Sequence, residues 1–363
     1  MKTLFMGDVS VAKDNAALFA QKDMETLFGD TAALFDGNDF SFVNLECAIT
    51  EHEGSIEKFG PPLKAPAETA EVLKMLGVDC CGLSNNHIFD YGKQGYFDTV
   101  AALNAAGLTY TGFGENYEDS RRSLIFEKGD ERLAVVAVCE HEYSYALPNR
   151  MGSRPFDEFD TMLDIRAAKK VADRVVVVYH GGKEHCRYPS PRLRRACRAM
   201  VKHGADLVLC QHSHCIGCYE AFEEGHILYG QGNFHFEWEF PTRPDSWVGC
   251  LAVGYDTKTN AVTFTPITSN GRGGIRLAKG DEGREMLSAF AARNEELKNG
   301  AWEKGWQDFC EAHRTTYEKV VGNACRPDAT EKDNKLFGHF LDCEAHTDVW
   351  RALFPTANQT NEL

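Results

Sequence analysis

Residues 80–92, CCGLSNNHIFDYG, decide how the rest of the sequence is interpreted. The segment begins as an apolar run typical of a buried strand and ends in amide, imidazole and carboxylate side chains. Polar clusters follow five other predicted strands in the same way, at Asp8, at Asn44 and Glu46, at His180, at His212 and His214, and at Asn233. Because α/β sheets build their sites in the loops at strand ends, this recurrence predicts one site assembled from distant segments.

The first 275 residues alternate short β-rich runs with helical segments, which is typical of a layered α/β fold. The predicted strands cover residues 3–6, 40–45, 79–84, 109–112, 132–139, 174–180, 206–211 and 226–230. Two hairpins are predicted, one turning at residues 127–131 and one joining residues 247–256 to 261–267. The predicted helices cover residues 65–76, 95–106 and 190–203.

The helix predicted over residues 190–203 has a basic face that we expect to be solvated, formed by Arg192, Arg194, Arg195 and Arg198. Beyond about residue 280 only helical periodicity remains, over residues 282–298 and 301–321. We therefore divide the chain into an α/β domain at residues 1–278 and a helical C-terminal appendage at residues 279–363.

Composition excludes several classes of protein. With 39 basic and 54 acidic residues among 363, the net charge is −15, whereas proteins that coat nucleic acids need basic residues to neutralise phosphates. No stretch approaches the roughly 18 apolar residues that span a bilayer, and no signal-peptide pattern is present, so we expect a cytoplasmic protein. The 13 cysteines favour reduced, buried thiols, and a structural zinc site at Cys215 and Cys218 is the weaker alternative.

The residue types at the strand ends narrow the chemistry to metal binding. Borderline divalent cations such as Mn²⁺, Fe²⁺ and Zn²⁺ accept mixed imidazole and carboxylate ligands, whereas Ca²⁺ prefers oxygen ligands alone. His212 and His214 lie two residues apart at a strand end, so both rings point toward the same side. Two such cations roughly 3.5–4 Å apart can hold a phosphate ester and activate a water for in-line attack.

In these residues the sequence resembles the capsule-synthesis branch (CapA-type, poly-γ-glutamate synthesis) of the calcineurin-like metallophosphoesterases. The matching blocks follow the family's order over roughly residues 3 to 240: GDVS, VNLECAIT, LSNNHIFDYGKQGYFDTVAALNAAGLTYTGFG, HGGKE, HGADLVLCQHSHCIGCYE and ILYGQGNFHFE. Ser10 stands where the superfamily's usual Asp-x-His opening has its histidine. The resemblance implies a four-layer α/β/β/α metallophosphoesterase-like sandwich with a metal cleft at the strand ends.

The resemblance also implies which residues bind the cations. Asp8 and His214 would bind one divalent cation, and Asn86, His180 and His212 would bind the other. Glu46 would bridge the pair, taking the place of the superfamily's aspartate.

Further residues of the site take their implied roles from the same resemblance. His87 would protonate the leaving oxygen, and Asp90 would orient its imidazole. Asn44, Asn85 and Glu184 would surround the ligands or contact the substrate.

Three functions are compatible with such a site. The first is a metal-dependent hydrolase that acts mainly on phosphate esters. In it, a metal-activated water attacks a small anionic or polymeric substrate. The second is a component of poly-γ-glutamate or capsule synthesis in which the site binds ligand or metal without turnover. The third is cleavage of amide bonds in such a polymer. The sequence leaves open the substrate, the metal and the oligomeric state.

Overall fold

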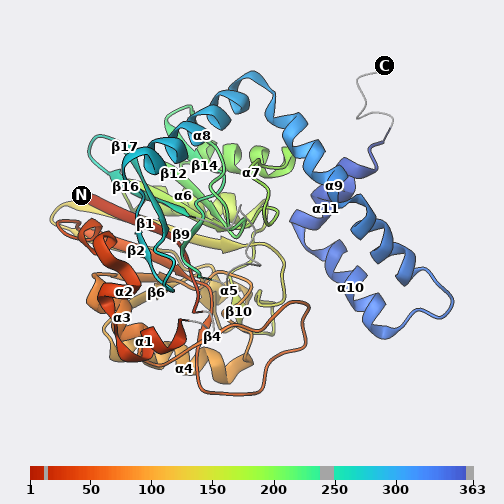
Figure 1. The fold of residues 1–363 in the computed structure, drawn as a ribbon, viewed down its shortest axis with the longest axis horizontal. Helices are drawn as coiled ribbons and strands as arrows, with labels where there is room; N and C mark the ends of the chain where they lie inside the picture. The colour runs from red at the N-terminus through yellow and green to blue at the C-terminus, as the bar shows by residue number, and fades with distance from the viewer. Residues whose placement is uncertain (12–14, 238–248, 357–363) are drawn as a thin grey trace.

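A computed structural model describes residues 1–11, 15–237 and 249–356. The body contains two large β-sheets with helices on their outer sides (Figure 1). The first is an eight-stranded sheet in the order β18-β17-β16-β1-β2-β5-β6, with β15 paired to β1. Its strands are β1 (Lys2–Val9), β2 (Phe40–Leu45), β5 (Cys80–Gly82), β6 (Thr109–Thr111), β15 (Asn233–His235), β16 (Cys250–Asp256), β17 (Ala261–Ser269) and β18 (Ile275–Leu277).

The second sheet has six strands in the order β13-β14-β12-β11-β9-β8. These are β8 (Leu124–Lys128), β9 (Glu131–Cys139), β11 (Arg174–His180), β12 (Leu207–Gln211), β13 (Tyr219–Phe222) and β14 (Gly225–Leu228). The predicted hairpins are confirmed, because β8 pairs antiparallel with β9 and β16 pairs antiparallel with β17. Residues 247 and 248 of the second hairpin lie outside the described residues.

Helices from the first third of the chain contribute to the core on the outer face of the eight-stranded sheet. They are α1 (Ala16–Gln21), α2 (Met24–Phe28), the 3-10 helix η1 (Gly29–Leu34), α3 (Thr69–Leu76) and α4 (Gly92–Ala105). Helices α6 (Asp160–Lys169) and α7 (Pro191–Lys202) cover the six-stranded sheet. The body also contains α5 (Tyr117–Ser120) and two short strand pairs, β3 (Ala48–Ile49) with β4 (Lys64–Ala65) and β7 (Phe113–Gly114) with β10 (Gly152–Ser153).

Side chains alternate between the two faces of each central strand, and this alternation produces the layers. In β1, Phe5 lies in the core between the sheets, while Met6 lies in the core under α1–α4. In β11, Val176 lies between the sheets, and Val177 lies under α6 and α7. Three hydrophobic cores therefore separate four layers, and the predicted α/β/β/α sandwich is confirmed.

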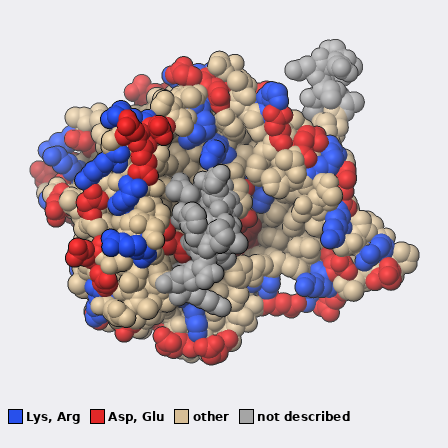
Figure 2. All heavy atoms as spheres, viewed as in Figure 1, with Lys and Arg blue, Asp and Glu red and all other residues tan. Residues whose placement is uncertain are grey.

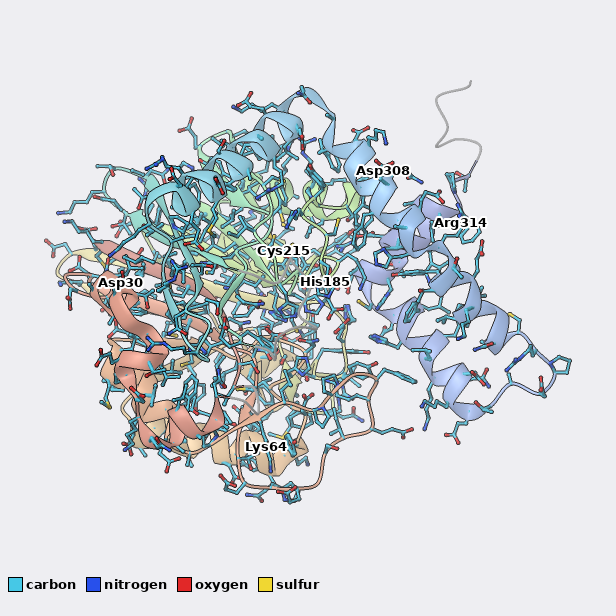
Figure 3. The ribbon with its side chains drawn as sticks, in the orientation of Figure 1. Asp30, Lys64, His185, Cys215, Asp308 and Arg314 are labelled. Carbon is cyan, nitrogen blue, oxygen red and sulfur yellow. The ribbon has the colours of Figure 1, made fainter. Side chains whose placement is uncertain are left out.

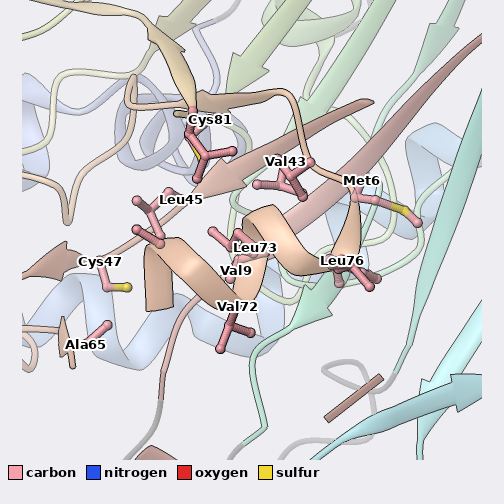
Figure 4. Packing of buried hydrophobic residues seen from close by; sticks show 14 of the residues in the cluster. Met6, Val9, Val43, Leu45, Cys47, Ala65, Val72, Leu73, Leu76 and Cys81 are labelled. Atoms are coloured by element: carbon pink, nitrogen blue, oxygen red, sulfur yellow. The ribbon is translucent and has the colours of Figure 1, made fainter. Parts of the chain in front are cut away.

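Helix α3 shows how local sequence and packing fix one of these layers. Its buried Leu73 and Leu76 lie among side chains of β1 and β2 (Figure 4), and the helix ends at Gly77, whose φ of 100° suits glycine. The prediction that this helix begins at residue 65 is wrong. Ala65 instead pairs with Ile49 in the β3–β4 ladder, and the helix begins four residues later.

The basic face of α7 is the second departure from expectation. Arg192 is buried, and its guanidinium contacts Asp348 at 2.9 Å and Glu140 at 3.2 Å. The prediction of a solvated face is therefore wrong for Arg192, because the C-terminal helices cover that part of α7. Arg194 and Arg198 are partly buried beside Glu220.

The C-terminal segment is helical, as predicted. It contains α8 (Gly280–Asn299), α9 (Trp302–Ala324), α10 (Glu331–Asp342) and α11 (Glu344–Leu353), and residues 357–363 lie outside the described residues. Figure 1 shows α8 over the body and α9–α11, in blue, beside it. Trp306, Tyr317 and Val349 join the hydrophobic core of α7. The domain boundary after residue 278 stays a prediction, and it falls between β18 and α8.

The charged surface and the polarity of the helices are those of a folded α/β body. Acidic and basic side chains are interspersed over the face shown in Figure 2. Each helix of the described residues is too short or too polar to cross a bilayer.

Candidate metal centre

The six predicted ligands meet where strands of the two sheets end. Asp8 lies near the end of β1, Glu46 directly follows β2, and Asn86 lies in the loop after β5. His180 ends β11, and His212 directly follows β12. Strands β1, β2 and β5 are parallel neighbours in one sheet, and β11 and β12 are parallel neighbours in the other, so their polar ends converge.

His180 is the centre of the first group of ligands. Its Nε2 lies 3.0 Å from Asn86 Oδ1 and 3.4 Å from Glu46 Oε1. Its Nδ1 lies 3.6 Å from Asp8 Oδ1. Ligand atoms of Asp8, Glu46 and His180 all lie within 4.8 Å of one another, and all three residues are buried.

A second group is formed by Glu46, His212 and His214, whose ligand atoms also lie within 4.8 Å of one another. His214 Nε2 is 3.9 Å from Glu46 Oε1, and its Nδ1 is 3.8 Å from Asp8 Oδ2. Asn233 Oδ1, from another of the predicted polar clusters, lies 2.9 Å from the same Nδ1. Glu46 is the residue that the two groups share.

Glu46 provides the test of whether these residues fit a cation. Its side chain is fully buried, and within the described residues neither carboxylate oxygen accepts a hydrogen bond. His212 Nδ1 is likewise buried without a hydrogen-bond partner among them. A buried carboxylate without such partners is costly, whereas carboxylate and imidazole groups together suit a borderline divalent cation. The donor set therefore fits a divalent metal ion.

His180, at the end of β11, and His212, directly after β12, differ in their protonation. Burial alone would lower the pKa of His180, but the negative charges of Glu46 and Asp8 outweigh it and raise that pKa to about 10. Burial lowers the pKa of His212 to about 4, and the charge of Glu142 offsets this only in part. At neutral pH His212 is therefore neutral and can offer a nitrogen lone pair, whereas His180 holds a proton that cation binding would displace.

The loop after β12 has an unusual backbone at both of its histidines. His212 has a φ of 75° and His214 a φ of 54°, which is the left-handed region. A non-glycine residue in that region costs of order 1–3 kcal/mol, so the surrounding fold must hold it there. One such contact is the His212 N–H, which donates to Asp8 Oδ2 at 3.1 Å.

His87 lies beside Asn86 and is held by two charged groups. Its Nδ1 is 2.7 Å from Asp90 Oδ2, and Asp90 is fully buried. Lys58 Nζ contacts Asp90 Oδ1 at 2.6 Å and lies 3.1 Å from His87 Nδ1. The sequence analysis missed Lys58, because it lies on a long loop that carries no motif.

The three remaining predicted residues differ in their surroundings. Asn44 donates to Asp8 Oδ1 at 2.7 Å, and Asn85 donates to Asn44 Oδ1 at 3.1 Å. Both asparagines are buried and bonded within the protein, so we propose that they position ligands and do not contact substrate. Glu184 is partly exposed beside Lys183. Figure 3 labels its neighbour His185, and Cys215 next to His214, on the side of the body that faces the C-terminal helices.

Glu142 is a second residue that the sequence analysis missed. It accepts a hydrogen bond from Asn86 Nδ2 at 2.7 Å, and its Oε1 lies 3.9 Å from His212 Nε2. Carboxylates in such positions orient metal ligands. A signal was present in Glu140-His-Glu142, because these residues follow β9 as the other polar clusters follow their strands.

A groove lies between the Lys58 loop and α10. It has a volume of about 700 Å³. The lining includes the basic residues Lys58, Arg150, Lys332 and Lys335, the acidic residues Glu57 and Asp342, and aromatic side chains such as Phe59 and Tyr143. Lys335 forms an ion pair with Glu57 at 3.0 Å. Through Lys58, this groove adjoins His87.

Comparisons with known proteins place the chain in a family. Bacterial capsule synthesis protein PGA_cap is the family that matches, over residues 2–237. The chain is 28% identical over 271 residues to the capsule biosynthesis protein CapA of Bacillus anthracis, covering 72% of this chain and 65% of that protein. It is 28% identical over 269 residues to the PGA biosynthesis protein CapA of Bacillus subtilis (strain 168), covering 73% and 70%. A crystal structure of a hypothetical protein from Thermus thermophilus aligns with a TM-score of 0.43 and 16% identity, covering 76% of this chain and 99% of that one.

Proposed function

We propose a function from the premise that this chain belongs to the PGA_cap family of bacterial capsule synthesis proteins, as its CapA-type sequence blocks predicted. The proposal is that the chain is a metal-dependent hydrolase that acts mainly on phosphate esters. Its cation site would be formed by the six buried ligands. The observation that carries it is Glu46, a buried carboxylate without a hydrogen-bond partner in the described residues and common to two ligand groups. Divalent cations held by the two ligand groups would satisfy the Glu46 carboxylate and would account for both properties.

When bound, the cations would supply Lewis acidity and an activated water. The chain's own residues would do the rest. Asn44 and Glu142 hold Asp8 and Asn86 in place through hydrogen bonds of 2.7 Å each. Phosphate esters also need a proton for the leaving oxygen, and protonated His87 would donate it from Nε2 while Asp90 accepts from Nδ1. Lys58, on the other side of Asp90, fixes that carboxylate and adds positive charge near an anionic substrate.

The direct test is turnover by the full chain after removal and return of metal. We expect the wild-type chain to hydrolyse p-nitrophenyl phosphate or bis(p-nitrophenyl) phosphate only with Mn²⁺, Fe²⁺ or Zn²⁺ added, and His180→Ala to abolish this. His203→Ala is the matched control, because this histidine caps α7 through the Ala199 carbonyl and takes no part in the site. Metal-independent turnover, or turnover unchanged in His180→Ala, would contradict the proposal.

A second candidate function is favoured by the names of the relatives and by the basic groove. In this alternative the chain takes part in capsule or poly-γ-glutamate synthesis, and the groove binds the acidic polymer without cleaving it. Calorimetric titration with poly-γ-glutamate, followed by gel analysis of polymer length, tests it. Binding that weakens in Lys335→Glu, with intact polymer and no phosphoesterase activity, supports this function. Shortened polymer would instead identify amide cleavage.

A further inference from the structure

The helical tail brings a second set of metal-binding side chains together beside the candidate metal centre. Ligand atoms of Glu142, Cys343 and His346 lie within 4.8 Å of one another, and all three residues are buried. Glu142 follows β9 in the body, whereas Cys343 lies between α10 and α11 and His346 lies in the first turn of α11. We propose that these three residues bind a zinc ion that fastens the C-terminal helices to the body.

The donor atoms favour zinc over Mn²⁺ and Mg²⁺ at this second site. A thiolate, an imidazole and a carboxylate are all ligands of tetrahedral Zn²⁺, while Mn²⁺ and Mg²⁺ prefer oxygen donors. With Zn–S of about 2.3 Å and Zn–O of about 2.1 Å, tetrahedral geometry separates sulfur and oxygen by about 3.6 Å. Cys343 Sγ and Glu142 Oε1 are 3.4 Å apart.

The surroundings of these side chains leave room for a positive charge. The nearest ring nitrogens to Glu142 Oε1 are those of His212 and His339, each at 3.9 Å, and among the described residues no lysine or arginine lies within 4.0 Å of it. Cys343 is fully buried, and its other polar contact is Glu140 Oε2 at 3.7 Å. Glu142 also accepts a hydrogen bond from the neutral amide of Asn86 at 2.7 Å. Neither Glu142 nor Cys343 therefore has a lysine or arginine ion pair among the described residues, and a cation would stabilise the buried carboxylate and thiol.

The remaining contacts orient the ligands. The Tyr317 hydroxyl lies 2.7 Å from His346 Nδ1, which leaves Nε2 of that ring as the ligand atom. A partner on the second ring nitrogen is the usual way in which proteins fix a ligating histidine. His339 on α10, close to Glu142, is the candidate for the fourth position.

This site is separate from the function proposed above. Two of its ligands come from α11 and the residue before it, outside residues 2–237 that the family covers. In the part of the chain that the structure describes, it meets the main centre at Glu142, which accepts a hydrogen bond from Asn86 and whose Oε1 lies 3.9 Å from His212 Nε2. Either site could therefore be absent while the other binds metal.

Absorption spectroscopy of the cobalt-substituted full chain tests the proposal, because only a thiolate ligand gives a strong near-ultraviolet charge-transfer band with Co²⁺. We expect the band in the wild-type chain, in His180→Ala, and in the control Cys325→Ser, which alters an exposed cysteine. We expect Cys343→Ser to lose the band and to bind one Zn²⁺ fewer per chain. Circular dichroism checks that each variant is folded.

The outcomes separate clearly. A wild-type chain without the band, or a band that persists in Cys343→Ser, would overturn the zinc site. If Cys343→Ser does not fold, His346→Gln decides: one Zn²⁺ fewer per chain supports the site, and unchanged zinc content overturns it. Because His180→Ala removes a ligand of the main centre only, loss of phosphoesterase activity with the band retained would leave this inference standing.

Discussion

In Glu46→Gln, a fully buried carboxylate loses its charge and keeps its shape. Without a cation, the wild-type site buries Asp8 and Glu46 beside His180, whose pKa of about 10 keeps it protonated at neutral pH. Two negative charges against one positive charge leave the site unbalanced, and a buried unpaired charge costs several kcal/mol. We therefore expect the metal-free Glu46→Gln chain to be at least as stable as the metal-free wild type.

Cation binding should reverse that order. A ligand that binds only the folded chain, at 100 times its Kd, adds about 2.7 kcal/mol of stability. With about 2.1 cal/mol/K of unfolding entropy per residue, the 363 residues give about 0.76 kcal/mol/K, so Tm should rise by about 3.5 °C. A 100-fold loss of affinity in Glu46→Gln reduces the gain to about 0.4 kcal/mol, or about 0.5 °C.

Thermal unfolding with chelator and then with Mn²⁺ measures both effects. Glu285→Gln makes the same chemical change at an exposed position on α8 and should respond to Mn²⁺ like the wild type. An equal rise of Tm in the wild type and in Glu46→Gln would show that Glu46 is not a ligand, and the proposed centre would fail with it.

Three further outcomes are expected. His87→Asn should reduce turnover of esters with poor leaving groups by about 10²–10⁴-fold and change p-nitrophenyl esters little, with metal content unchanged; an equal loss for both substrate types would remove His87 as the acid. Burial lowers the pKa of His235 to about 4, so this ring is neutral in the folded chain near neutral pH. Because the ring titrates near pH 6.5 in the unfolded chain, its contribution to the free energy of unfolding is complete above about pH 6.5 and is lost as the pH falls through about 4. Urea unfolding between pH 4 and pH 8 should show this loss of unfolding free energy, about 3 kcal/mol in full, and the loss should be smaller in His235→Gln. If the unfolding free energy of both chains depends on pH in the same way, the loss does not come from His235. Arg192→Met leaves Asp348 and Glu140 without their cation and should cost about 3–5 kcal/mol in chemical unfolding, whereas Arg195→Met, at an exposed position of the same helix, should stay within about 0.5 kcal/mol.

Strands that end in polar side chains were the predictable part of this protein. The bounds of β2 and β11 agree with the prediction because each is a largely apolar run with a polar side chain at or next to its end, Asn44 or His180. The start of α3 was not predictable, because the pairing of Ala65 with Ile49 is a tertiary contact that overrides the helix signal at Pro66. Local pattern also placed Arg192 on a solvated face, since nothing near it in sequence indicates that α11 covers it.

The site divides in the same way. The strand-end pattern indicated the polar clusters, and the family resemblance selected the six proposed ligands among them. The structure brings these side chains together. Lys58 reaches Asp90 from a loop without a motif, and Cys343 comes from a helix pair whose position is set by the hydrophobic core of α9 and α11. These contacts depend on how elements distant in the sequence pack together, and no local sequence pattern indicates that packing.

The left-handed backbone at His212 and His214 has a consequence for the cation site proposed above. Folding has already restricted the loop to the conformation in which both imidazoles converge, so little conformational entropy remains to be lost when the ion arrives. At the proposed site, capture should therefore be limited by shedding the hydration shell of the ion and by release of the His180 proton. Cations of similar size should be exchanged without any rearrangement of the chain.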